Sequence, residues 1–310
     1  MDVFNTLSAI ERNSVFYANG SAWQVWNKPK NANFVYFFLI GGGGGGGSGN
    51  TSSFTSTTGG GGGGSSAITR AIFAANMLPD TLYIKIGLGG IGGISNTANE
   101  TGGNGTSSHI NFQPNSDPIN VLLKSDDIPA AGGGGAPSST VSGVGGLAAT
   151  SWTYTNFVNG KSGLISSIGG QNGAAGTNTG GTVNNFNVTL IVTGGAGGGA
   201  VSNGASPYNG GSILGSSFLP TISAGVNDAA DQTIHGVNGI SFLPNISLMK
   251  NPMFFTGGGG GAPSTTTGRA GGKGGNASFG SGGGGGGGAY NGVGGVGGVG
   301  GDGLALIVTL

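Results

Sequence analysis

The chain of 310 residues contains no cysteine and very few charged residues. Without thiols it forms neither disulfides nor thiolate metal sites. Only 6% of its residues are charged, and the ten basic side chains balance the ten acidic ones. A protein without excess positive charge has no surface to hold a phosphate backbone, so we expect no nucleic-acid partner. Near-zero net charge also favours self-association, as in a component of a larger assembly.

Long apolar runs and a basic leader are also missing. The apolar run at residues 34–40 is far shorter than the roughly 20 residues that a membrane-spanning helix needs. Residues 1–5 carry no basic segment of the kind that begins a secretory signal. We therefore expect neither an export signal nor a membrane span.

Glycine is abundant, with 76 copies. The pattern is not that of collagen, because there are only 11 prolines and no continuous Gly-X-Y register. It is not that of a flexible linker either, because 35% of the residues are hydrophobic and 8% are aromatic. The composition predicts an ordered, packed chain.

Part of the glycine repeats with a period of three, as in residues 87–94 (GLGGIGGI) and residues 292–301 (GVGGVGGVGG). This period fits neither an α-helix nor a strand. It fits an extended helix of the polyproline II kind, with three residues per turn and a rise of about 3.1 Å. Such a helix has no internal hydrogen bonds, so neighbouring glycine rods are expected to bond sideways.

The third residue of each triplet is expected to lie along one edge of its rod. These edge residues form either an apolar seam between layers or a contact with a partner chain, and we expect burial within one molecule. Residues 269–276 repeat with the same step but place polar residues on it, which predicts an edge that meets solvent. The apolar edge residues are Leu88, Ile91, Ile94, Val293, Val296 and Val299.

Short runs of β-branched and aromatic residues precede several glycine tracts and predict strands. Residues 66–78 fit a helix with a Ser cap that ends before Pro79, and a strand is the competing interpretation. The fold class that we predict is mainly β and irregular: packed polyglycine II helices in a sandwich, a small β-sheet and little α-helix. The predicted strands are residues 34–40, 82–86, 188–192 and 304–310.

Residues 1–33 differ from the rest, because they carry Trp23, Trp26, several charges and no glycine run. We interpret them as an N-terminal attachment segment, with a hairpin turn at Asn19-Gly20. Residues 34–310 form the glycine-rich domain. Within it, residues of about 138–255 have scattered glycine and resemble an irregular, loop-rich insertion.

Catalytic and nucleotide-binding patterns are not supported. Gly272-Lys273 and Gly160-Lys161 lack the glycine five residues before the Gly-Lys pair that a phosphate-binding loop requires. His109 and His235 have neither metal-ligand spacing nor a nucleophile nearby, and Asp126-Asp127 is typical of a solvated turn. We predict no enzyme, no metal and no cofactor.

Aromatic residues in the irregular region are the candidates for a recognition surface, because rings give large contact area at small entropic cost. Packing over the ends of the rods explains them equally well. These residues are Trp152, Tyr154, Phe157, Tyr208 and Phe218.

The order of these blocks resembles the glycine-rich domain of tail-fibre and other virion proteins of bacteriophages. The match covers roughly residues 34–135 and 254–310. Its landmarks are an aromatic strand entering polyglycine (34–47), a second tract (59–64), a Pro-containing strand entering the triplet repeat (78–94), and the tracts at 257–263, 282–288 and 301–303.

The resemblance implies a polyglycine sandwich whose tip loops recognise the host surface, as in monomeric adhesins on the long tail fibres of T-even-like phages. It implies that residues 1–33 dock the protein onto its fibre, with Trp23 and Trp26 as attachment residues. Loops at the far end would then contact the receptor.

We therefore expect a non-enzymatic structural protein of a phage or virus, located in the virion as a tail-fibre or fibre-tip component. Its expected partners are fibre-shaft, baseplate or capsid proteins, a host-surface glycan or outer-membrane protein, and further copies of itself, as in a trimer. One alternative is a capsid decoration or minor baseplate protein that binds no receptor. A more distant one is an ice-binding protein, which the Leu, Ile and Val edge residues disfavour.

Overall fold

The computed structural model describes most of the chain, and its residues are mainly β. Within the described part there are short 3-10 turns, η1 (Ala75–Met77) and η2 (Pro118–Asn120), but no α-helix. The described residues are 13–17, 20, 22–52, 56–94, 99–127, 131–138, 141–153, 165–177, 179–184, 191–201, 208–215, 220–226, 235–242 and 254–310.

A sheet of order β1-β13-β3-β5-β9 joins strands from both ends of the chain, with every pairing antiparallel. Its central strands are rich in aromatic and β-branched residues, which suit a pleated surface buried on both faces. The strands are β1 (Asn13–Tyr17), β13 (Leu304–Thr309), β3 (Phe34–Ile40), β5 (Ile68–Ala74) and β9 (Ile165–Ile168).

A second antiparallel sheet, of order β2-β6-β7-β8, packs against the first. In β6 burial alternates residue by residue, so only one face of this sheet meets the core. Phe37 of the first sheet makes an edge-to-face contact with Trp26 of the second, with 6.1 Å between the ring centroids. The strands are β2 (Gln24–Asn27), β6 (Thr81–Lys85), β7 (His109–Asn111) and β8 (Val121–Lys124).

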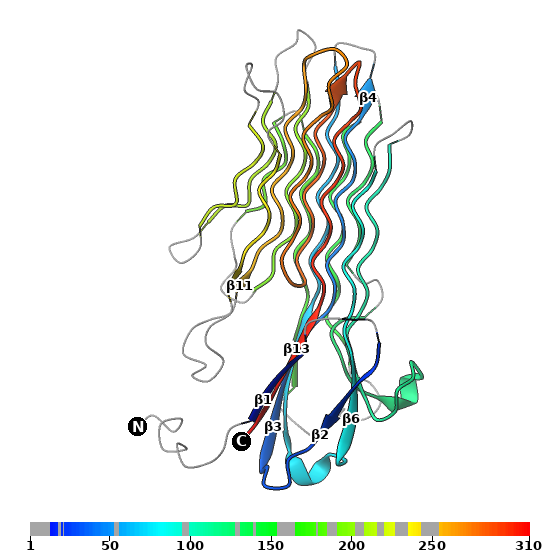
Figure 1. The fold of residues 1–310 in the computed structure, drawn as a ribbon, viewed down its shortest axis with the longest axis vertical. Helices are drawn as coiled ribbons and strands as arrows, with labels where there is room; N and C mark the ends of the chain where they lie inside the picture. Colours follow the sequence, from blue (N-terminus) through cyan, green and yellow to red (C-terminus); the bar gives the residue numbers. More distant parts are fainter. Residues whose placement is uncertain are drawn as a thin grey trace.

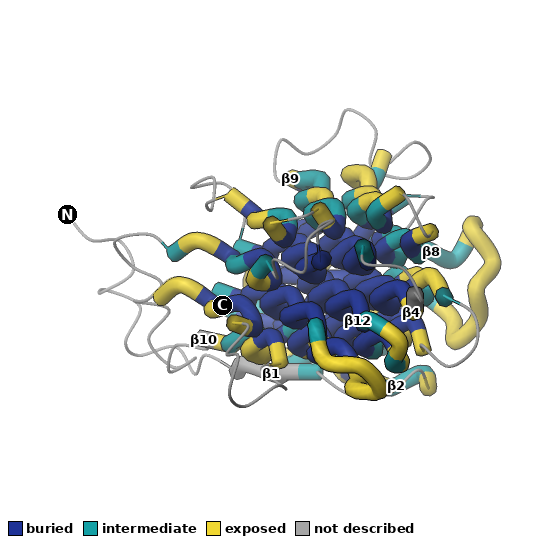
Figure 2. Tube along the Cα trace, turned by 90° about the horizontal axis from the view of Figure 1, so that it is seen from above, coloured by how far each residue is buried: buried dark blue, intermediate teal, exposed yellow. Residues whose placement is uncertain are grey.

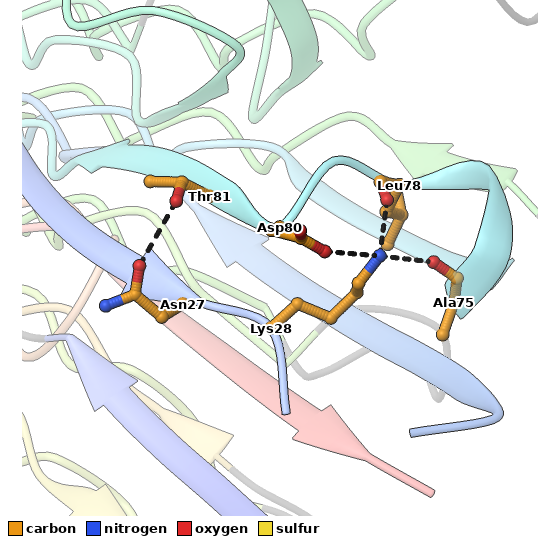
Figure 3. Close-up of polar contacts among 6 residues, drawn as sticks. All are labelled: Asn27, Lys28, Ala75, Leu78, Asp80 and Thr81. Carbon is orange, nitrogen blue, oxygen red and sulfur yellow. Dashed lines mark hydrogen bonds and ion pairs between the residues drawn. The ribbon is translucent and has the colours of Figure 1, made fainter. Parts of the chain in front are cut away.

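Lys28 closes the loop that joins β5 to β6 (Figure 3). Its ammonium donates hydrogen bonds to the carbonyls of Ala75 and Leu78, at 2.9 and 2.6 Å, and lies 3.3 Å from Asp80 Oδ1. Because Asp80 is almost fully exposed, the two carbonyl bonds contribute more than the ion pair.

Beyond the sheets, glycine-rich segments run side by side along the long axis of the molecule (Figure 1). We call these segments rods. The rod at 41–50 changes its hydrogen-bond acceptor segment with every residue and returns to the same segment after three. The acceptors are Thr106, Gly301 and Gly64 for the amides of Gly42, Gly43 and Gly44, and Gly103, Gly298 and Gly61 for Gly45, Gly46 and Gly47.

The carbonyls of the same rod accept from three other segments, again in rotation, so rod 41–50 is surrounded by bonded neighbours. Seen from the end, the buried residues form one continuous interior with exposed residues around it (Figure 2). The donors to its carbonyls are Gly90 and Gly93, Gly134, and Gly283 and Gly286.

The hydrogen bonds arrange the rods in layers. One outer layer contains rods 87–94, 292–301 and 269–277, and rod 143–148 belongs to the outer layer on the opposite side. Between them lie rods 41–50 and 283–288, then 58–64 and 194–200. The last of these falls in the region predicted to be irregular, and its residues are buried.

The hairpin prediction is wrong. The strands expected to form a hairpin around Gly20 do exist, but β1 pairs with β13 whereas β2 pairs with β6 in the other sheet. Of the two interpretations of residues 66–78, the strand holds for residues 68–74, which form β5, because pairing with β3 on one side and β9 on the other outweighs helix propensity. The described part of residues 1–33 is thus built into both sheets.

The expected burial of the triplet residues is also wrong. Leu88, Ile91 and Ile94 are 42, 71 and 52% exposed, and Val293 and Val299 are 45 and 44% exposed. They point out of the outer layer because no described segment covers their rods there. The polar edge at 269–276 is exposed, as predicted.

The tip of the rods as candidate recognition site

The rods separate two ends of the molecule (Figure 1). β1 and the end of β13 lie at one end with the two sheets, whereas β4 (Thr51–Ser52) pairs in parallel with β12 (Ala289–Tyr290) at the other. Rod 41–50 connects β3 directly to β4, so it spans this distance without a break. We call the end with β4 and β12 the tip.

The apex of the tip is built around Tyr290. Its backbone amide donates to the carbonyl of Ser264 at 3.0 Å, while its side chain is half-buried. Asn291 follows with φ of 45°, a left-handed conformation that turns the chain from one rod into the next. Thr266, Thr267 and Arg269 are exposed beside it, so the apex offers an aromatic ring, hydroxyls and one cation.

A network of amides and carbonyls fixes the neighbouring loops of the tip. Asn99 Nδ2 donates to Asn50 Oδ1 at 2.9 Å and to the carbonyl of Pro137 at 2.8 Å. The carbonyl of Ser138 accepts from Asn50 Nδ2 and from Thr58 Oγ1, at 3.2 and 2.6 Å. Because each loop is held by side chains of another, the loops of the tip are fixed relative to one another.

The structure does not bring the sequence-predicted aromatic residues together. Trp152 is half-buried against the core between the sheets. Tyr208 is half-buried near the tip, where its amide donates to the carbonyl of Ala200 at 3.0 Å. Tyr154, Phe157 and Phe218 lie outside the described residues.

The two tryptophans of the predicted attachment segment have different environments. Trp26 is only 3% exposed and belongs to the core, so it has no surface for a partner. Trp23 is half-buried on the second sheet, with the Lys85 ammonium 5.8 Å from its ring centroid. Of the pair, only Trp23 has exposed surface.

Sequence reasoning missed Tyr290. The available signal was an isolated aromatic residue between the tract at 282–288 and the triplet repeat at 292–301. The chain must turn between these two consecutive rods. Because the first rod starts near the sheets, the turn lies at the opposite end, which is the tip.

One titratable group of the interior, Asp126, is part of a hydrogen-bond network. Asp126 is buried and accepts hydrogen bonds from Ser66, Ser107 and Ser125 where rod 41–50 leaves the sheets. Burial raises the pKa of this carboxyl, and the three hydroxyls oppose the rise. It is a buried hydrogen-bonded group and not the solvated turn that the sequence suggested.

His109 lies in β7 between Lys85 and Lys124 on the neighbouring strands. Burial, helped by these two cations, lowers the pKa of its imidazole to about 4. His235 lies at the surface of the rods, where its Nδ1 accepts from the amide of Lys273 at 3.0 Å. The two histidines therefore occupy unrelated places.

No three His, Asp or Glu side chains of the described residues gather as a metal site. The described helices include none that is long and apolar enough to cross a membrane.

A mainly β fold that continues into laterally bonded glycine rods defines a class of glycine-rich protein. The chain belongs to the family described as the glycine-rich domain, whose profile matches residues 18–309. The match begins before residue 33, so it includes both β2 and the rods. No curated protein matches the chain.

Proposed function

We propose that the rods adopt the polyglycine II conformation. Two observations support this: the bonded neighbour of rod 41–50 changes with a period of three, and exposed residues recur at every third position of residues 141–150, the segment that contains rod 143–148. A helix with three residues per turn directs successive amides about 120° apart, which produces this rotation.

We further propose that the protein is a non-enzymatic structural component of a phage or virus particle, displaying its tip for host-surface binding. The observation that carries the proposal is the separation of the tip from the sheets by cross-bonded rods (Figure 1). Rods that bond on several sides resist bending, so the molecule is suited to hold loops away from an attachment point.

The sheet end, with Trp23 on its surface, would attach to a fibre-shaft, baseplate or capsid protein. The tip, with Tyr290, the threonines and Arg269, would contact a host-surface glycan or outer-membrane protein. Aromatic rings and hydroxyls are groups that stack on and hydrogen-bond to sugars. Several copies on one particle would strengthen weak contacts by avidity.

Cell binding of purified protein tests this function. Labelled protein is incubated with a panel of bacterial strains, and a strain that retains it is used to compare Tyr290→Ala with Val25→Ala, which alters an exposed residue of the sheet end. We expect binding to fall at least tenfold for Tyr290→Ala and to stay unchanged for Val25→Ala.

Equal binding by both variants would contradict recognition at the tip. If no strain binds the protein, but its removal from particles lowers their resistance to heat, the capsid decoration alternative is favoured instead.

A further inference from the structure

The exposed triplet residues form one surface, because the two apolar rods are neighbours in the outer layer. The amides of Gly297 and Gly300 donate to the carbonyls of Gly93 and Gly90, at 2.9 and 2.8 Å. The two rods therefore run antiparallel with their side-chain rows adjacent. We call this surface the apolar face; it consists of Leu88, Ile91, Ile94, Val293, Val296 and Val299.

The apolar face cannot fold inward to hide these side chains. The backbones beneath it are in close contact: a Cβ on Gly92 would lie 2.0 Å from the Gly297 carbonyl oxygen. The exposed fractions correspond to about 400 Å² of apolar surface, within the range for the largest patch on a monomer, which is often functional. A rigid surface of this kind favours a partner.

The spacing of the face points to a second copy of the same chain. Side chains stand every three residues on both rods, about 9 Å apart for a rise of 3.1 Å per residue. An identical face has an identical repeat, so the rows of two copies stay in register over their full length.

The charges beside the face select one orientation. Exposed Arg269 and Lys273 lie on the rod next to Val293, and exposed Glu100 lies beside Ile94 on the other side. A two-fold axis parallel to the rods brings the Leu and Ile row over the Val row of the other copy. It also brings Lys273 of each copy opposite Glu100 of the other, because the bonds from Gly274 to Val296 and from Gly297 to Gly93 place the two side chains at the same level along the rods.

The area available for an interface is that of the two faces and their flanks. Complete coverage of two apolar faces buries roughly 800 Å² of apolar surface together, and the flanking polar residues add to this towards the approximately 1,000 Å² of a specific interface. The six side chains of the face are uncharged, and Asp302, the next residue of the Val row, accepts a hydrogen bond from the amide of Gly89 at the sheet end of the face.

We propose that the apolar face binds the same face of a second copy in a two-fold dimer whose sheet ends lie on the same side. This orientation leaves both tips free and pointing in one direction. The proposal does not depend on the function proposed for the tip.

The opposite outer layer provides a matched control. Val144 and Leu147 are 67 and 64% exposed on rod 143–148, which has a single apolar row. Mass measurement by light scattering and sedimentation is made on the wild type, on Ile91→Ser/Val299→Ser and on Val144→Ser/Leu147→Ser. We expect a wild-type dimer, a dissociation constant raised at least 100-fold in the first variant, and a change below threefold in the control.

A charge exchange tests the orientation. Glu100→Arg should weaken the dimer at least tenfold, and adding Lys273→Glu should restore at least half of the lost affinity on a logarithmic scale. Unchanged thermal unfolding of each variant shows that the rods are intact.

A wild-type monomer at about 100 μM, a trimer, or equal effects of the two serine double variants would overturn the dimer. A failure of the second charge to restore affinity would overturn the two-fold arrangement.

Discussion

Gly46→Ala tests directly whether the rods are held by backbone contact. Gly46 lies in the middle of rod 41–50, where its amide donates to the Gly298 carbonyl and its carbonyl accepts from the Gly93 amide, both at 2.8 Å. A Cβ at this position would lie 2.0 Å from the carbonyl oxygen of Gly284 on the neighbouring rod. The methyl group fits only if the two rods move apart by at least about 1 Å.

The size of this movement sets the cost. Rods 41–50 and 283–288 are joined by hydrogen bonds of 2.9 Å from Gly283 to Gly44 and from Gly286 to Gly47. An added 1 Å takes both beyond hydrogen-bond distance, and each buried group left without a partner costs about 1–3 kcal/mol. Replacing glycine by alanine also lowers the conformational entropy of the unfolded chain, but this stabilises the folded protein by only about 0.4–1 kcal/mol. Two broken hydrogen bonds leave four such groups, so we expect a net loss of at least about 3 kcal/mol in the free energy of unfolding.

Gly103→Ala is the matched control, because it too lies within a rod. Its Cβ would meet Ile91 Cγ1 and the Ile91 amide nitrogen at 3.1 Å, and its rod is at the surface. The side chain of Ile91 is exposed and can yield, so we expect a change within about 1 kcal/mol. Urea unfolding followed by circular dichroism measures both. A loss below 1 kcal/mol for Gly46→Ala would refute the claim that rod spacing is fixed.

Four further substitutions test the sheet end. Because folding lowers the His109 pKa to about 4, the contribution of the neutral imidazole to the free energy of unfolding is complete above pH 6.5 and declines as the pH falls towards 4. Between pH 7 and 5, we expect the wild type to lose about 1–2 kcal/mol more unfolding free energy than His109→Gln, as measured by urea titration. Lys28→Met should lower the unfolding free energy by about 1–2 kcal/mol and Asp80→Asn by less than half of that, and equal losses would show that the ion pair dominates. Phe37→Ala should cost about 3–5 kcal/mol in thermal unfolding, and a loss below 1 kcal/mol would mean that the two sheets do not share one core.

Strand positions could be predicted where a run of strand-forming residues ends at a glycine tract. β3 and β13 match the predicted runs at 34–40 and 304–310, because β3 is an aromatic stretch and β13 an aliphatic one, each with β-branched residues and next to glycine. Their partners could not be predicted, since β13 pairs with β1 and β3 across most of the chain. Of the run at 188–192, residues 188–190 lie outside the described residues.

The triplet pattern predicts which side chains share an edge but not what covers that edge. Ile91 and Val296 each lie on a row, as expected, yet burial depends on whether another rod packs outside it. That is a property of the layer order, which long-range hydrogen bonds set. For the same reason, the sequence could not show that Trp152 lies near the sheets and Tyr208 near the tip.

Outer rods carry amides that point away from the interior, and side chains of adjacent rods satisfy several of them. Asn104 Oδ1 accepts from the amide of Gly133 at 2.9 Å, Asn276 Oδ1 from Val299 at 3.0 Å and Asp302 Oδ1 from Gly89 at 2.8 Å. An Asn or Asp at the third position of a triplet thus occupies the outward-pointing amides of the adjacent rod. Charged residues and covering loops protect the edge strands of β-sheets in a similar way. Leu, Ile and Val cannot accept such bonds. Their concentration on two adjacent rods is therefore not explained by closing edges, and the contact with a second copy gives it a physical reason.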